Sequence, residues 1–159
     1  ARKEAGLLVL LNKYIQKKKG VAPFGEKFNA REAPESNIAL RGMCLKHIDK
    51  KDMPLIIGVG DTVTSVKDID SGEYCRGGSD RGFLTLIQQL GEDYNKNNQI
   101  LIVDSSWGEV ERPRLAGDNL IGVSDPDDPL KFNLVFREGP EQYIKWFKDL
   151  INLRYKSII

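Results

Sequence analysis

The chain has 159 residues, of which 40% are hydrophobic, and its 24 Lys and Arg residues against 23 Asp and Glu give a formal net charge of +1. This length and composition predict one folded domain with a sizeable core rather than a disordered segment. The near-zero net charge argues against a nucleic-acid-binding protein whose main contacts are to phosphates. No apolar run reaches the roughly 18–20 residues that a bilayer requires, so we expect a cytoplasmic protein without a membrane partner.

The two cysteines carry no metal-site signal. Neither Cys44 nor Cys75 has a second Cys or His at the spacing of a zinc ligand set. Two free thiols in a reducing compartment fit these counts better than a disulfide, which stays open as the alternative.

The first part of the chain predicts two helices and a strand. Apolar residues recur at helical spacing over residues 4–18, and Gly20 follows a Lys-rich last turn, where helices commonly end. An irregular loop over 21–36 leads into a second helix, expected from residue 34 or 35 to His47. The apolar run 54–59 is typical of a strand buried on both faces of a parallel sheet.

The rest of the chain alternates in the same way. Ser79 and Asp80 offer an N-cap for a third helix that reaches Tyr94. The other expected elements are a long polar loop at 62–78, strands at 99–103 and 131–136, a loop at 104–128, and a helix opened by residues 139–140. This alternation predicts a single α/β domain over residues 1–159, with a mostly parallel sheet flanked by helices.

Ligands of such sheets gather outside the carboxyl ends of the strands. The densest polar residues of this chain follow Val59 and Val103, which end two predicted strands. The GxGxxG fingerprint and the phosphate-loop pattern are both missing, so nicotinamide and nucleoside-triphosphate chemistry lose their main support.

Asp61 is the sharpest local feature, because it follows a buried strand in a Gly-flanked turn. A carboxylate in that position suits Mg²⁺, which takes one or two carboxylates, waters and phosphate oxygens. Asp68, Asp70 and Glu73 in the same loop could add a ligand or an acceptor. The alternative is an ordinary Gly-Asp turn.

Arg41 and Lys46 lie on the helix that leads into this strand. A fixed cation near an acidic metal site neutralises charge on a phosphate in transfer, which makes both residues catalytic candidates. The alternative is a solvated helix face. His47 is expected to be a helix cap or a surface residue.

Residues 76–87 (RGGSDRGFLTLI) hold the second feature. Their glycines, with Ser79 and Asp80 between Arg76 and Arg81, could form a cradle for an anion or for sugar hydroxyls. A capped helix with surface arginines is the alternative.

Asp104 follows the second strand in the same way and is a further candidate for substrate binding. Trp107 could stack on a sugar ring or simply pack. The acidic stretch 125–129 could bind a cation, although two prolines in a tight turn explain it.

Taken together, Arg41-Gly42, the buried strand and Gly60-Asp61 resemble the third and fourth motifs of haloacid-dehalogenase-type phosphatases. Residues 60–65 (GDTVTS), 76–87 and 124–129 (SDPDDP) are similar to the glucosylglycerol-phosphate phosphatase family of that superfamily, a salt-tolerance group. The similarity extends from about residue 39 to 147.

The resemblance implies a haloacid-dehalogenase-like, Rossmann-like core and Mg²⁺-dependent hydrolysis of glucosylglycerol phosphate, which yields an osmolyte. It makes Asp61 the metal carboxylate and places Arg41, or Lys46, at the family's basic position. In these enzymes a separate aspartate attacks phosphorus.

Two departures from the family pattern matter. Ser65 stands where the fourth motif has a second acidic residue, so Asp68 or water would complete the metal shell. No Asp-x-Asp follows an apolar strand, because 68–70 and 125–127 lack one. We therefore expect a carboxyl-terminal fragment, inactive by itself, whose nucleophile lies in an amino-terminal part of the same protein.

Two other functions remain open at this point. One is a non-catalytic α/β module that binds a sugar phosphate or a protein partner. The other is a self-contained metal enzyme that uses Asp61 and Asp104.

Overall fold

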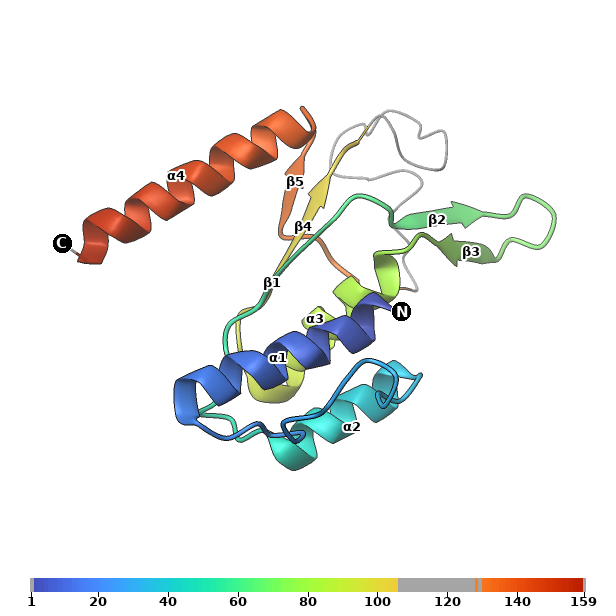
Figure 1. Ribbon diagram of the computed structural model, residues 1–159. Helices are drawn as coiled ribbons and strands as arrows, with labels where there is room; N and C mark the ends of the chain where they lie inside the picture. The colour runs from blue at the N-terminus through green and yellow to red at the C-terminus, as the bar shows by residue number, and fades with distance from the viewer. Residues whose placement is uncertain (1, 106–127, 129, 159) are drawn as a thin grey trace. The chain divides into compact units, whose positions relative to one another are not determined.

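The computed structural model describes residues 2–105, 128 and 130–158 (Figure 1). Within them the helices are α1 (Lys3–Lys19), α2 (Asn37–His47), α3 (Arg81–Tyr94) and α4 (Pro140–Ile158). The strands are β1 (Ile57–Gly60), β2 (Thr64–Lys67), β3 (Tyr74–Gly77), β4 (Gln99–Val103) and β5 (Leu134–Phe136). The four helices and the three strands of the predicted sheet are confirmed, with shifted ends.

One expectation was wrong, because residues 62–78 are not a continuous loop. They contain the antiparallel hairpin of β2 and β3, in which Thr64 faces Gly77 and Lys67 faces Tyr74. The β-branched residues of β2 favour a strand. The surrounding Gly, Ser and Asp residues, which suit turns, hid that signal in the sequence.

Three strands form a sheet in the order β1-β4-β5. β4 and β5 pair in parallel, with Leu101 opposite Leu134 and Val103 opposite Phe136. The α/β class is therefore confirmed.

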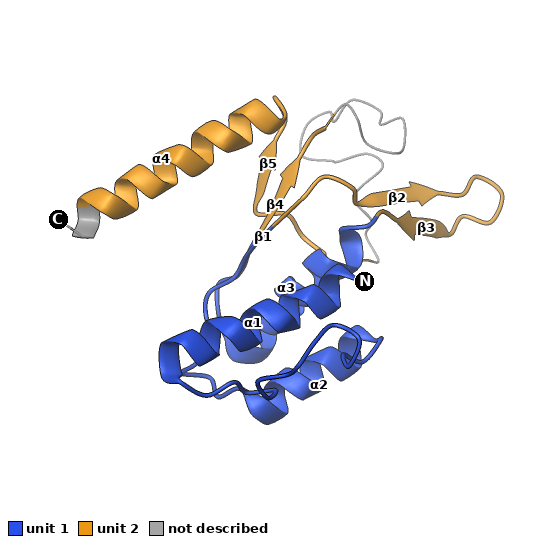
Figure 2. Cartoon of the chain, viewed as in Figure 1, with its two compact units in different colours: residues 1–58, 79–99 blue, residues 59–78, 100–159 orange. Residues whose placement is uncertain are grey.

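The residues divide into two compact units (Figure 2). Unit 1 comprises residues 1–58 and 79–99, and unit 2 comprises residues 59–78 and 100–159. The single domain predicted from the sequence stays a prediction, and the units are described separately.

Unit 1 is built around leucines that are fully buried on three helices. Leu8 of α1, Leu40 of α2 and Leu84 of α3 are each 0% exposed. α2 begins where Ser36 accepts a hydrogen bond from the Ala39 amide at 3.1 Å. This is the usual way to satisfy an amide that a helix leaves without an internal partner.

Gly58 lets β1 lie directly against α3. A Cβ atom at this position would stand 2.7 Å from Ile87 Cδ1 and 2.8 Å from Leu84 Cδ2. Any side chain at residue 58 would therefore push the strand away from the helix.

Asn98 joins three elements of unit 1. Its Oδ1 accepts from the Ile56 amide at 2.9 Å, and its Nδ2 donates to the Ile87 carbonyl at 2.8 Å. The Gln99 amide donates to the Ile56 carbonyl at 3.0 Å. The start of β4 is thereby fixed beside the residue that precedes β1.

Unit 2 has a core of Leu101, Val103 and Phe136, against which Val59 and two aromatic residues of α4 pack. The Phe136 ring lies 5.6 Å from that of Tyr143 and 5.4 Å from that of Trp146, between ring centroids. Aromatic packing therefore attaches the first two turns of α4 to the sheet. Over the described residues, the helices lack the combined length and apolarity needed to cross a bilayer.

Both thiols are free, as expected, but they differ in exposure. Cys44 is buried and Cys75 is exposed, and burial raises the pKa of the Cys44 thiol to about 12.

We predict that a disulfide reagent at pH 8 modifies Cys75 quickly and Cys44 only after unfolding, because the thiolate is the reactive form. The measurement is the number of thiols titrated before and after addition of denaturant. A Cys75→Ser variant should lose the fast reaction alone, and equal rates for both thiols in the native chain would contradict the prediction.

Candidate functional site

The candidate site of unit 2 lies where two neighbouring strands end. β1 and β4 are adjacent in the sheet, and the Gln99 amide at the start of β4 bonds the carbonyl of Ile56, the residue just before β1, so the two strands run in the same direction. Asp61 follows the end of β1, and Asp104 follows the end of β4. Both carboxylates are therefore carried at one edge of the sheet, and both residues are partly buried. The Asp104 amide donates to the Phe136 carbonyl at 3.0 Å, which fixes that end of β4 to β5.

The base of the β2–β3 hairpin returns to the residue after Asp61. Gly78 has φ +91°, and a Cβ atom there would stand 2.0 Å from the Thr62 carbonyl oxygen. Only glycine allows this approach, because it combines a left-handed backbone with the absence of a side chain. Gly78 therefore sets the position of the hairpin beside the candidate metal carboxylate.

Ser65 is buried on β2, where it is 2% exposed and faces Arg76 across the hairpin. A carboxylate at such a position would lose most of its hydration. Burial at this position therefore favours an uncharged side chain such as serine over an acid.

Arg76 pairs with Asp128 within unit 2. Its Nε lies 3.4 Å from Oδ2 of Asp128, whose side chain is buried, while Arg76 itself is exposed. Asp128 Oδ1 also accepts from the Leu130 amide at 2.9 Å. Trp107 and residues 125–127, singled out in the sequence, lie outside the described residues.

Asp68 closes the turn of the hairpin. Its Oδ1 accepts hydrogen bonds from the Ser71 amide at 2.8 Å and the Asp70 amide at 2.9 Å. These two bonds, the one from Ser71 first, hold the pKa of the exposed Asp68 carboxyl below its usual value. The structure gives Asp68 a role in the turn, and its predicted role as a metal ligand stays a prediction.

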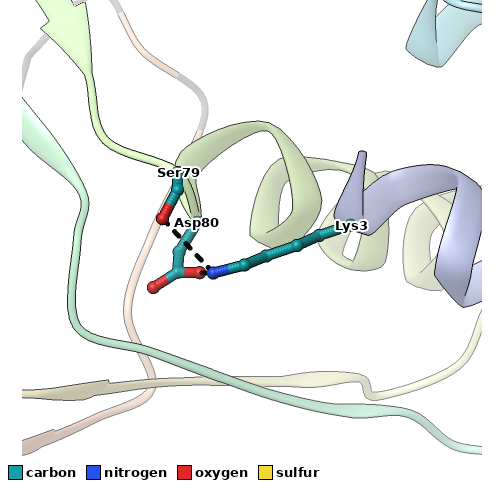
Figure 3. Close-up of polar contacts among 3 residues, drawn as sticks. All are labelled: Lys3, Ser79 and Asp80. Atoms are coloured by element: carbon teal, nitrogen blue, oxygen red, sulfur yellow. Dashed lines mark hydrogen bonds and ion pairs between the residues drawn. The ribbon is translucent and has the colours of Figure 1, made fainter. Parts of the chain in front are cut away.

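Asp80 belongs to unit 1, where it pairs with Lys3 of α1 (Figure 3). Lys3 Nζ contacts Asp80 Oδ1 and lies 3.3 Å from Ser79 Oγ. The predicted helix start is confirmed, since α3 begins at Arg81. The predicted cap is wrong in its chemistry, because the N-cap residue Asp80 makes no side-chain cap bond.

Arg81 is buried, being 6% exposed, which corrects the alternative of a surface arginine at this position. Arg76 is exposed, as that alternative expected. Arg76 lies on the hairpin in unit 2 and Arg81 lies in the first turn of α3 in unit 1, so the cradle stays a prediction.

Arg41 joins α2 to α3 through Asp93. Its Nε donates to Asp93 Oδ2 and its Nη2 to Oδ1, both at 2.8 Å. The hydrogen bonds to Asp93 raise the pKa of Arg41. Lys46 and His47 are exposed at the end of α2, which confirms the surface position expected for His47. Whether Arg41 or Lys46 contacts a phosphate stays a prediction.

Sequence reasoning did not find Lys3 or Asp93. Each lies on a helix far along the chain from its partner, and neither stands in a motif. The sequence could show that Lys3 and Asp93 lie on helices, but it could not show which residues they contact.

Among the described residues, no group of three or more His, Cys, Asp or Glu side chains is gathered as a metal cage. Mg²⁺ does not require one, because it keeps several waters and binds through one or two carboxylates. Asp61 and Asp104 are two hard oxygen donors at one edge of the sheet, which is compatible with this mode of Mg²⁺ binding.

The fold and this edge define an α/β protein that carries two carboxylates, Asp61 and Asp104, directly after the ends of neighbouring strands. The chain belongs to the glucosylglycerol-phosphate phosphatase family, whose model matches residues 1–151. It is 45% identical over 163 residues to a glucosylglycerol-phosphate phosphatase of Synechocystis sp.. That alignment covers 96% of this chain and 39% of the relative's length, so the chain spans about two fifths of that protein. No solved structure matches the chain.

We predict that Gly78→Ala lowers the free energy of unfolding by more than about 2 kcal/mol, because the left-handed backbone alone costs about 1–2 kcal/mol and the overlap with Thr62 adds to it. Urea unfolding measures the loss. Gly72→Ala is the matched control, since Gly72 has φ +72° but no atom within 4 Å of the place that a Cβ atom would take. Equal losses in both variants would rule out the close approach as the cause.

We predict that Arg41→Lys and Asp93→Asn each lower the free energy of unfolding by about 1–3 kcal/mol. Lysine cannot form a bidentate ion pair with a carboxylate, and an asparagine side chain carries no negative charge to pair with Arg41. In a double-mutant cycle the losses should not add. Arg31→Lys, on an exposed loop, should change little. Additive losses would show that the two residues do not act as a pair.

Proposed function

We propose that this chain is the carboxyl-terminal part of a Mg²⁺-dependent phosphatase of the cytoplasm that hydrolyses glucosylglycerol phosphate to glucosylglycerol and phosphate. The observation that carries the proposal is the match of residues 1–151 to the glucosylglycerol-phosphate phosphatase family. The product is an osmolyte, which connects the protein with salt tolerance. A non-catalytic α/β module is less well supported, because the relative that covers nearly this whole chain is a phosphatase.

Asp61 is proposed as the carboxylate that holds Mg²⁺, on a haloacid-dehalogenase-like core. When bound, the ion supplies positive charge to the phosphate oxygens. The two backbone bonds on Asp68 favour water over this residue as the completing ligand. Asp104, which follows the adjacent strand, is proposed to accept a hydrogen bond from the substrate.

Several polar and charged residues are proposed to contact the substrate. Arg76, Ser79, Asp80 and Arg81 are proposed to contribute contacts to the sugar phosphate. Lys46 is exposed, whereas the Arg41 guanidinium already holds Asp93. This difference favours Lys46 as the cation that faces the phosphate.

The attacking aspartate is proposed to lie outside this chain, in the amino-terminal part of the same protein. The chain lacks an Asp-x-Asp after an apolar strand and spans 39% of its Synechocystis relative. The amino-terminal part of the protein is therefore the expected partner of this chain, and the isolated chain should not hydrolyse substrate.

We predict that the 159-residue chain releases no phosphate from glucosylglycerol phosphate with Mg²⁺, while a polypeptide extended upstream does. Asp61→Asn in the extended polypeptide should lower kcat by at least about 100-fold, because it removes a charged ligand of the ion. Asp149→Asn, an exposed acid on α4, is the control and should leave kcat unchanged. An extended polypeptide that is inert on sugar phosphates would refute the proposal.

A further inference from the structure

α4 is longer than the core that it covers. It runs over 19 residues, from Pro140 to Ile158. In unit 2, Tyr143 and Trp146 of its first two turns pack on the cluster of Leu101, Val103 and Phe136. β5, the strand that contacts α4, has only three residues. The second half of the helix therefore extends past the strand to which its first half is attached.

Exposed apolar side chains occur along most of α4, in its first half as well as its second. Six of them, each between 38% and 67% exposed, form what we call the apolar face of α4: Ile144, Phe147, Leu150, Ile151, Leu153 and Tyr155. Glu141, Lys145, Lys148, Asp149 and Asn152 line the more polar side of the helix together with Ile144. At about 100° of rotation per residue, one charged side chain, Arg154, lies within the arc of the apolar side chains.

The apolar side chains of α4 cover a wider arc of the helix than packing against a single core requires. At about 100° of rotation per residue, Tyr143, Trp146 and the six exposed side chains spread over roughly 200° of the helix. A helix that packs against a single core needs a stripe of about 100°. The aromatic cluster at the start of α4 accounts for part of this arc, and the remainder has the character of an interface.

The family polypeptide supplies an occupant for that interface. The Synechocystis relative is much longer than the alignment, which covers 39% of it, so a large part of such a protein lies outside this chain. Permanent protein complexes bury apolar surface at their contacts, much as a core does. Within unit 2, the exposed half of α4 offers such a surface.

We propose that the apolar face of α4 is the surface on which the remaining part of the phosphatase polypeptide packs. This inference rests on the proposed function in one respect, namely that the chain is part of a longer polypeptide. In the isolated chain the face is then uncovered, and in the longer protein it is buried.

Hydrogen exchange compares the two states directly. The amides of residues 147–156 should exchange at least about 10-fold more slowly in the extended polypeptide than in the 159-residue chain, because packing raises the free energy of local opening. The amides of α1 and α3 are the internal reference. Unchanged exchange of α4 would overturn the inference.

Two outcomes in the isolated chain would also overturn it. Slow exchange of α4 at every concentration would show that this chain covers the face itself. Protection that increases with concentration would show that a second copy covers it.

A matched pair of substitutions tests the side chains. In the extended polypeptide, Ile151→Lys should restore fast exchange of residues 147–156, whereas Asn152→Lys, which adds the same charge on the polar side, should not. Circular dichroism verifies that both variants fold, which is expected because neither residue is in the core cluster. Equal exchange in the two variants would contradict the proposed face.

The exchange result and the enzyme assay separate this inference from the proposed function. Protection of α4 in an inert polypeptide would support the interface and reject the phosphatase. Phosphatase turnover with an unprotected α4 would support the proposed function and reject the interface.

Discussion

The register between β1 and β4 is the constraint on which the candidate site depends. Asn98 sets it, because a single side chain bonds the Ile56 amide and the Ile87 carbonyl while the next residue bonds the Ile56 carbonyl. A shift of one residue would reverse the faces of the strand. Asp61 and Asp104 follow the same edge of the sheet because both strands start from this anchor.

Charged side chains in this fold serve first as connections between elements. Arg41 joins α2 to α3, and Lys3 joins α1 to the residue before α3. Arg76 joins the hairpin to Asp128. Several residues that the sequence nominates for binding are therefore already oriented by a protein partner. A ligand that bound to these residues would meet groups already held in place, which reduces the ordering cost of binding.

The sequence predicts well what depends on local periodicity. The four helices and the three strands of the sheet follow from apolar spacing, and Asp61 and Asp104 follow from their place after strands. The expected burial of the first strand on both faces is wrong, because Ile57 of β1 is 44% exposed, and of the described strands of this sheet only β4 is largely buried. The sequence does not predict the partner of Asp80, because pairing with Lys3 depends on how helices pack and not on any motif. The hairpin was missed for a related reason, since four-residue strands give too little alternation to stand out beside turn residues.

The Gly78 contact has a consequence for how the hairpin can vary. Its base is fixed against Thr62, next to Asp61, whereas its turn is closed locally by Asp68 and carries Ile69 almost fully in solvent. The turn of the hairpin can therefore tolerate sequence changes that its base cannot. The turn can be lengthened, shortened or exchanged for that of a relative while the backbone beside the acidic site keeps its shape, so the hairpin is a natural place to graft a new specificity.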